Sequence, residues 1–197
     1  MKTIKFILTL LLTLMYVQLS YAQGDASRFS FEIAGGPSHA KQTLGDADLN
    51  FGGGFEAVFH YRVMPHAGVY AGWGWNKFSA DQSFAGSNAD FEETGYVFGL
   101  QFKHPLGLGS TLGFLRAGGL YNHIEIENRD GDIIEDTGHG FGLQIAGGVE
   151  IPVSGKWSIT PGVKFNSLSR DLDDDSSQIR ELTLRYQSLR IGFHRKF

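Results

Sequence analysis

The sequence contains no cysteine and only five prolines, and after residue 19 it has no long hydrophobic run. The lack of cysteine excludes disulfides and a lipid anchor attached through a thiol. The remaining apolar runs fall short of the roughly 18 residues that a membrane-spanning helix needs, which argues against an α-helical membrane protein. The chain also lacks a positive charge balance, since its formal charge is −4. Nucleic acid is therefore an unfavourable partner.

The first 22 residues predict a cleaved secretory signal peptide. Lys2 and Lys5 form a basic start, residues 6–19 are apolar, and Ser20-Tyr21-Ala22 is a small-x-small cleavage site. An uncleaved membrane anchor is the alternative, but the apolar run is short for a span. We therefore expect one exported domain, residues 23–197, with a formal charge of −6 (15 basic against 21 acidic residues).

Glycine is abundant, at 27 of 197 residues, and apolar and polar side chains alternate along much of the chain. Glycine weakens helix interiors, whereas a period of two places successive side chains on opposite faces of a strand. The pattern is clearest at residues 51–78. There Phe55 and Phe59 share one face while Glu56 and His60 share the other, and the alternation resumes after a break at residues 62–66. This stretch predicts a β-hairpin of two long strands.

The same alternation predicts eight strands in the mature chain. We expect them at residues 29–34, 51–61, 67–76, 95–103, 115–122, 141–151, 157–166 and 182–197. The first strand would end at Gly35-Gly36-Pro37. Long polar connections at residues 38–50, 79–92, 128–137 and 170–181 alternate with three short turns. The last strand requires one β-bulge near Gln187 or Ser188 to keep its apolar residues on one face.

The two faces of these strands suggest an apolar side toward lipid and a polar side toward a narrow interior. Arg116 is placed inside because arginine on the lipid face near the midplane costs about 2–4 kcal/mol. The predicted lipid-facing residues are Phe55, Phe59, Val69, Trp73, Phe98, Leu100, Leu143, Ile145, Val163 and Ile191. The predicted interior polar network is Glu32, Glu56, Gln101, Arg116, Gln144, Glu150, Lys164, Arg185 and Arg190. Aromatic residues are expected at the edges of the lipid-facing band, Phe78 among them.

The signal peptide, the eight alternating strands and the terminal stretch Leu189-Arg-Ile-Gly-Phe-His-Arg-Lys-Phe197 resemble the small outer-membrane barrels of the OmpA/OmpX-like superfamily. They most resemble the outer membrane protein β-barrel domain group of Gram-negative bacteria. The resemblance implies an all-β, eight-stranded antiparallel up-and-down transmembrane β-barrel. It also implies contact with outer-membrane lipid and lipopolysaccharide, insertion by the barrel-assembly machinery and a monomeric state. Arg195 interrupts the apolar alternation of this terminal stretch.

Motifs for chemistry are weak. The seven histidines include no pair at ligand spacing, so we predict no metal, cofactor or catalytic site. His39 beside Ser38, with Asp81 and Ser83 in the next long connection, is similar in layout to outer-membrane lipid-A acyltransferases. Residues 171–175 have the carboxylate spacing of a calcium loop, but Ser176 and Leu182 stand where that loop has its glycine and glutamate, which favours a solvated acidic loop.

These observations predict a non-enzymatic outer-membrane protein with a structural or surface-interaction role through acidic extracellular loops. Three alternatives stay open. A narrow porin-like channel needs an unobstructed interior. A lipid-A-modifying enzyme needs one of His39, His123 or His139. A soluble lipocalin-like binding barrel needs its large aromatic side chains turned inward.

Overall fold

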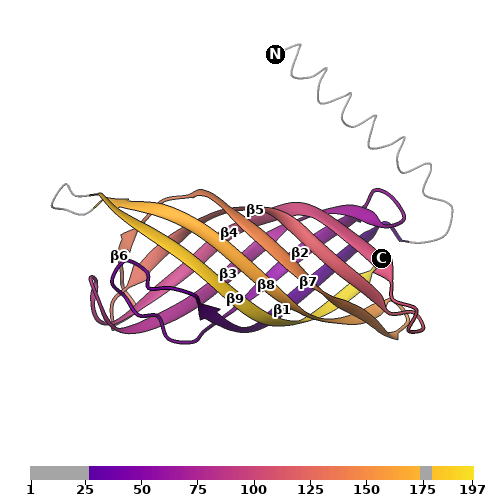
Figure 1. Ribbon diagram of the computed structural model, residues 1–197, viewed down its shortest axis with the longest axis horizontal. Helices are drawn as coiled ribbons and strands as arrows, with labels where there is room; N and C mark the ends of the chain where they lie inside the picture. The colour runs from indigo at the N-terminus through magenta and orange to yellow at the C-terminus, as the bar shows by residue number, and fades with distance from the viewer. Residues whose placement is uncertain (1–26, 174–178) are drawn as a thin grey trace, which may run out of the picture.

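The computed structural model describes residues 27–173 and 179–197, which form a closed antiparallel barrel of tilted strands (Figure 1). Eight strands form the ring in the order β4-β3-β2-β1-β9-β8-β7-β5, and pairing between β4 and β5 closes it. A short strand, β6, pairs with β5 outside the ring. The strands are β1 Phe29–Ala40, β2 Gly52–Arg62, β3 Ala67–Ser83, β4 Gly86–Pro105, β5 Leu112–Glu127, β6 Ile133–Asp136, β7 Gly140–Ser154, β8 Trp157–Asp173 and β9 Ile179–Lys196.

The eight predicted barrel strands and their antiparallel order are therefore confirmed, while β6 was not foreseen. Within the described ranges, no helix is long and apolar enough to cross a membrane. The predicted signal peptide and the acids at positions 174 and 175 lie outside the described residues.

The barrel has two unlike ends. The turn end carries three short connections, β2–β3, β4–β5 and β7–β8, together with the first residue of β1 and the last of β9. The loop end carries the connections β1–β2, β3–β4, β5–β7 and β8–β9. Successive connections alternate between the two ends because the strands run up and down around the ring.

The strands extend farther toward the loop end than predicted. The expected connection at residues 79–92 is almost entirely strand, since β3 ends at Ser83 and β4 begins at Gly86. Likewise Gly35-Gly36-Pro37 does not end β1, which continues to Ala40. A Cβ added to Gly36 would lie 2.1 Å from the carbonyl oxygen of Leu189, so this glycine permits the close approach of β1 and β9.

The predicted β-bulge in the last strand is absent from the described β8–β9 pairing. The register is continuous from Trp157↔Arg195 to Asp173↔Ile179. Leu184, Tyr186, Ser188 and Arg190 consequently all point inward and are buried. Arg185 lies on the outer surface and is exposed, so its predicted inward position was wrong. The error arose because we assumed that the apolar face is the outer face along the whole strand.

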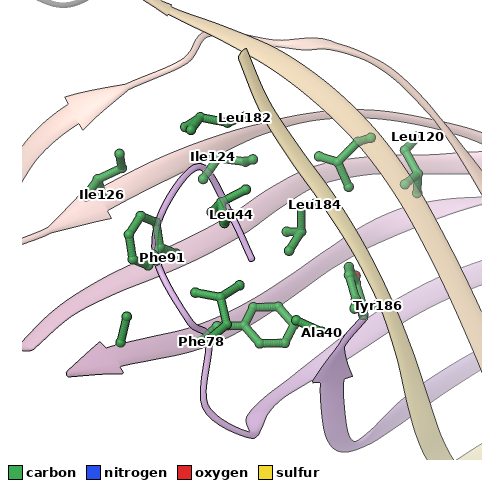
Figure 2. Close-up of a cluster of buried hydrophobic side chains, with 14 of the residues drawn as sticks. Ala40, Leu44, Phe78, Phe91, Leu120, Ile124, Ile126, Leu182, Leu184 and Tyr186 are labelled. Carbon is green, nitrogen blue, oxygen red and sulfur yellow. The ribbon is translucent and has the colours of Figure 1, made fainter. Parts of the chain in front are cut away.

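The side-chain polarity of the strands reverses along the barrel. Toward the turn end, apolar side chains point outward and polar ones inward; toward the loop end, apolar side chains point inward (Figure 2). Phe78 illustrates the change, because it is fully buried inside and does not belong to the outer aromatic residues as predicted. The apolar cluster toward the loop end includes Leu44, Phe78, Phe91, Leu120, Ile124, Ile126, Leu168, Leu172, Leu182 and Leu184.

The β1–β2 connection fills the loop end of the barrel. We call residues 41–51 the plug segment. Its Leu44 and Ala47 are 0% exposed, pair with each other through two backbone hydrogen bonds, and pack within the apolar cluster (Figure 2). The polar connection expected here therefore contributes apolar side chains to the core.

Candidate functional site: the barrel interior

The centre of the barrel holds a bidentate ion pair between β5 and β1. Arg116 donates from Nη1 and Nη2 to the two carboxylate oxygens of Glu32, at 3.0 and 2.7 Å. Its Nε donates to Gln101 on β4 at 2.8 Å. The neighbouring strands β4 and β5 are thus connected across the interior to β1, which is far from them in the sequence. Such charge-assisted pairs need this degree of hydrogen bonding to offset the desolvation of both charges.

A second ion pair lies beside the first. Lys164 on β8 is 2.7 Å from Oε2 of Glu56 on β2, and the same oxygen accepts a hydrogen bond from Gln144 at 2.9 Å. Tyr70 donates to the amide oxygen of Gln144 at 3.1 Å. Polar side chains from four strands therefore satisfy one another across the barrel.

Closer to the loop end, a buried carboxylate is held by neutral groups. Glu93 accepts hydrogen bonds from Tyr186 at 2.7 Å, from Asn76 at 3.2 Å and from Asn122. The oxygen of the Asn76 amide in turn accepts from Arg190 at 2.6 Å. The Asn76 amide thereby links the buried acid Glu93 to the buried base Arg190.

At the turn end, Glu150 on β7 is fully buried beneath two lysines. Lys103 and Lys196 each place Nζ 2.7 Å from one of its oxygens, and Ser158 donates at 3.2 Å. His194 Nδ1 lies 3.5 Å from the same carboxylate. Glu150, Lys103, Lys196 and His194 all line one cavity at this end of the barrel.

The structure places most of the sequence-predicted residues where the alternation put them. Of the predicted interior residues, Glu32, Glu56, Gln101, Arg116, Gln144, Glu150, Lys164 and Arg190 are buried inside the barrel, while Arg185 is outside. The ten predicted lipid-facing residues, Phe55, Phe59, Val69, Trp73, Phe98, Leu100, Leu143, Ile145, Val163 and Ile191, are all exposed on the outer surface.

Several interior residues escaped the sequence analysis. Glu93 fell between an expected loop and an expected strand, and Arg170 fell in an expected loop. Arg170 is buried and donates to the backbone carbonyl oxygens of Asn122, Phe141 and Ser169. Both residues could have been identified from the sequence, because the alternation of inward and outward side chains continues beyond the aromatic residues expected at the edge of the lipid-facing band.

The outer surface at the loop end is charged. Lys77 on β3 lies 2.7 to 3.0 Å from carboxylate oxygens of Asp90, Glu92 and Glu127. Partial burial works to lower the pKa of Lys77, but its hydrogen bonds to these acids outweigh burial and raise it. The pKa of Glu92 is lowered, because hydrogen bonds from Lys77 and Trp75 outweigh burial.

Next to this cluster, His123, Glu125 and Asp136 place one ligand atom each within 4.8 Å of one another, which is close enough to hold a metal ion. Asp136 accepts from His123 Nδ1 at 2.9 Å, and the ring of His139 stacks on His123 at 4.2 Å. The pKa of Asp136 is lowered, since the hydrogen bonds from His123 and Gly138 outweigh burial. The ion pair explains this arrangement without a metal.

The residues of the lipid-A acyltransferase layout each have other partners. Ser38 points inward and hydrogen-bonds Asn76 and Ser188, whereas the ring of His39 stacks on Phe51. Asp81 accepts from Asn50, and Ser83 donates to the carbonyl of Gly86. In the described part of the chain, these four residues do not form a common site.

Comparisons with known proteins agree with this architecture. A family model described as Outer membrane protein beta-barrel domain matches residues 7–197. A search of curated proteins found no match. Among solved structures, Neisserial surface protein A is similar with a TM-score of 0.65 at 16% identity, over 88% of this chain and 100% of that chain.

Two further solved structures have the same fold. Outer membrane protein W of E. coli gives a TM-score of 0.57 at 14% identity, over 89% of this chain and 100% of that chain. OprG of Pseudomonas aeruginosa gives 0.53 at 13% identity, over 87% and 98%. At these identities the likeness concerns the fold alone.

Proposed function

Because the chain belongs to the outer membrane protein β-barrel domain family, and is thus a β-barrel of the Gram-negative outer membrane, we propose that it is a closed, non-enzymatic barrel. Its role is structural and surface-interacting, and it acts through the acidic loop end, which faces the outside of the cell. It works as a monomer in contact with lipid and lipopolysaccharide, after insertion by the barrel-assembly machinery.

The observation that carries this proposal is the filled interior. The plug segment places Leu44 and Ala47 among the buried side chains of the loop end. Between the plug segment and the turn end, ion pairs such as Arg116–Glu32 connect strands across the interior. An eight-stranded barrel is just wide enough for side chains to fill it, so a continuous water path has no room.

The outer surface of the loop end supports the surface-interaction role. One lysine, Lys77, stands among five acids on this face, which are Asp90, Glu92, Glu125, Glu127 and Asp136. Such a surface attracts positively charged partners and repels acidic ones, more strongly at low salt. We therefore propose a basic peptide segment as the class of surface ligand.

The closed interior is tested by current recordings. The purified mature protein is reconstituted in a planar bilayer of neutral lipid. We expect membrane insertion without unitary currents. Steady, reproducible currents from the wild-type protein would favour the narrow channel and contradict the proposal.

The surface role is tested by titrating an oligolysine peptide onto the protein in dodecyl maltoside micelles. Replacing Glu92 and Glu125 by glutamine should weaken binding about tenfold, with the difference shrinking as salt is added. Asp48→Asn combined with Asp171→Asn removes the same charge from exposed acids elsewhere at this end and serves as the control. Equal weakening by both double variants would show that net charge, not this surface, governs binding.

A further inference from the structure

A cavity of about 390 Å³ lies at the turn end of the barrel, opposite the plug segment. Its lining comes from the turn ends of β1, β2, β3, β4, β5, β7 and β9, from the residues just before β1 and from the β2–β3 turn. Small-molecule sites commonly have volumes of about 300–1,000 Å³. We call this cavity the turn-end cavity.

The charge of the turn-end cavity is opposite to that of the whole chain. Among the described residues, four basic side chains line it, Arg28, Arg62, Lys103 and Lys196, and one carboxylate does, that of Glu150. That carboxylate already contacts two of the four, since Lys103 and Lys196 are each 2.7 Å from it. In a chain of formal charge −4, the cavity is therefore a local concentration of positive charge.

Two histidines mark the inner end of the turn-end cavity. His60 pairs with Ser30 and His194 with Ser158, one step farther into the barrel than Arg62 and Lys196. The two rings lie 5.8 Å apart in an edge-on arrangement. Both side chains thus line a part of the cavity that lies deeper in the barrel than Arg62 and Lys196.

Both imidazoles are buried without hydrogen-bond partners among the described residues. His60 is 4% exposed and His194 is 0% exposed. Their nearest carboxylate oxygens are those of Glu32, 4.0 Å from His60, and Glu150, 3.5 Å from His194. A buried polar group without a hydrogen bond is costly, and an ion or an ordered water that supplies the missing hydrogen bond is one explanation for it.

We propose that the turn-end cavity binds a phosphate-type oxyanion that enters from the periplasm. The imidazole N–H groups of His60 and His194 donate to its inner oxygens, and Lys103 and Lys196 compensate its charge. The same chemistry has two sources, a free phosphate ester or the head group of a phospholipid in the inner leaflet. This site is independent of the surface role of the loop end.

The test is a titration of inorganic phosphate onto the mature protein in dodecyl maltoside, followed by ³¹P NMR. We expect saturable binding to one site. Lys196→Gln and His60→Gln should each weaken it about tenfold, as expected when a charge-assisted hydrogen bond is lost. Lys156→Gln is the control, because Lys156 is an exposed lysine in the β7–β8 turn and does not line the cavity.

A second arm separates the two sources. If a head group occupies the site, phosphatidylglycerol nanodiscs compete with free phosphate and weaken its apparent affinity, whereas no competition identifies a free ester. Gel mobility with and without boiling shows that each variant is folded. The proposal is overturned if phosphate does not saturate in either medium, or if Lys196→Gln and His60→Gln bind as tightly as Lys156→Gln.

Discussion

Two arginines show how position determines the role of a residue in this barrel. Arg116 is buried and hydrogen-bonded to Glu32 and Gln101, whereas Arg185 is exposed on the outer surface. Sequence alternation assigned both to the interior. The difference arises because Arg116 lies at the level where lipid surrounds the barrel. Arg185 lies closer to the loop end, where the outer surface meets water.

Replacing these arginines should have very different effects on stability. Arg116→Met leaves the carboxylate of Glu32 buried without its partner, which typically costs about 3–5 kcal/mol. Arg185→Met changes an exposed side chain and should stay within about 0.5 kcal/mol. Urea unfolding in lipid vesicles, followed by gel mobility without boiling, measures both. Adding Glu32→Gln to Arg116→Met should recover part of the loss.

Similar losses for the two single variants, or no loss for Arg116→Met, would show that the interior pair is not formed.

The charged cluster around Lys77 predicts a pH dependence for the loop end. The folded pKa of Glu92 is lowered from 4.5, so its stabilising contribution is complete above 4.5 and is lost as pH falls through the lowered value. The pKa of Lys77 is raised from 10.5, so its contribution is complete below 10.5 and is lost at still higher pH. The cluster should therefore be stable from about pH 5 to 10.

The indole of Trp75 reports this titration, because its N–H donates to Glu92 at 2.6 Å. We expect the indole ¹⁵N–¹H resonance of Trp75 to shift on acidification with a midpoint below 4.5. In Glu92→Gln this titration should disappear. A midpoint at or above 4.5 in the wild-type protein would contradict the ion pairing.

At the scale of the elements, alternation was sufficient to predict eight strands but not their ends. The expected loop at residues 79–92 contains charged and small residues, which read as solvated. In the barrel the same residues alternate, with Phe91 inside and Asp90 and Glu92 outside. Strand segments surrounded by water have polar side chains outside and apolar ones inside, so the polarity of lipid-surrounded strands does not identify them.

For the candidate site, the sequence predicted which side chains point inward but not which of them pair. Parity identified Glu32 and Glu56 as interior residues, because each lies opposite an apolar face, and Arg116 was placed inside because of the cost of an arginine in lipid. Pairing across the barrel was not predictable, since the partners of Glu150 and Glu93 depend on strand tilt and register. The plug segment was also hidden, because its buried apolar residues Leu44, Ala47 and Leu49 are unevenly spaced in a polar stretch and give no periodic signal.

The plug segment can be tested as an element. Leu44→Asp places a charge at a position with no exposed surface, which should expel residues 41–51 from the barrel. We expect rapid proteolysis within this segment in intact vesicles and the appearance of small currents in planar bilayers. Thr43→Asp, at the exposed neighbouring position, is the control and should behave like the wild type. Equal protease resistance of both variants would contradict the plug.

At the scale of the whole molecule, the protein is a barrel with two differently organised halves. Toward the turn end its strands are apolar outside and polar inside; toward the loop end the order is reversed. A single continuous register joins the halves, as β9 and β8 show. The half toward the turn end has an outer surface compatible with lipid and encloses the turn-end cavity. The half toward the loop end has an outer surface compatible with water and encloses the apolar cluster.

The reversal of polarity along β9 is tested most directly by site-directed spin labelling, which the absence of native cysteine makes straightforward. Single cysteines replace Leu184, Arg185 and Ile191 in the reconstituted barrel. Collisions with oxygen and with a water-soluble nickel reagent then report the surroundings of each label. We predict that the label at 191 contacts lipid, the label at 185 contacts water, and the label at 184 contacts neither. A label at 184 that collides freely with oxygen in the lipid would instead show a bulged strand with Leu184 on the outside, and would contradict the account.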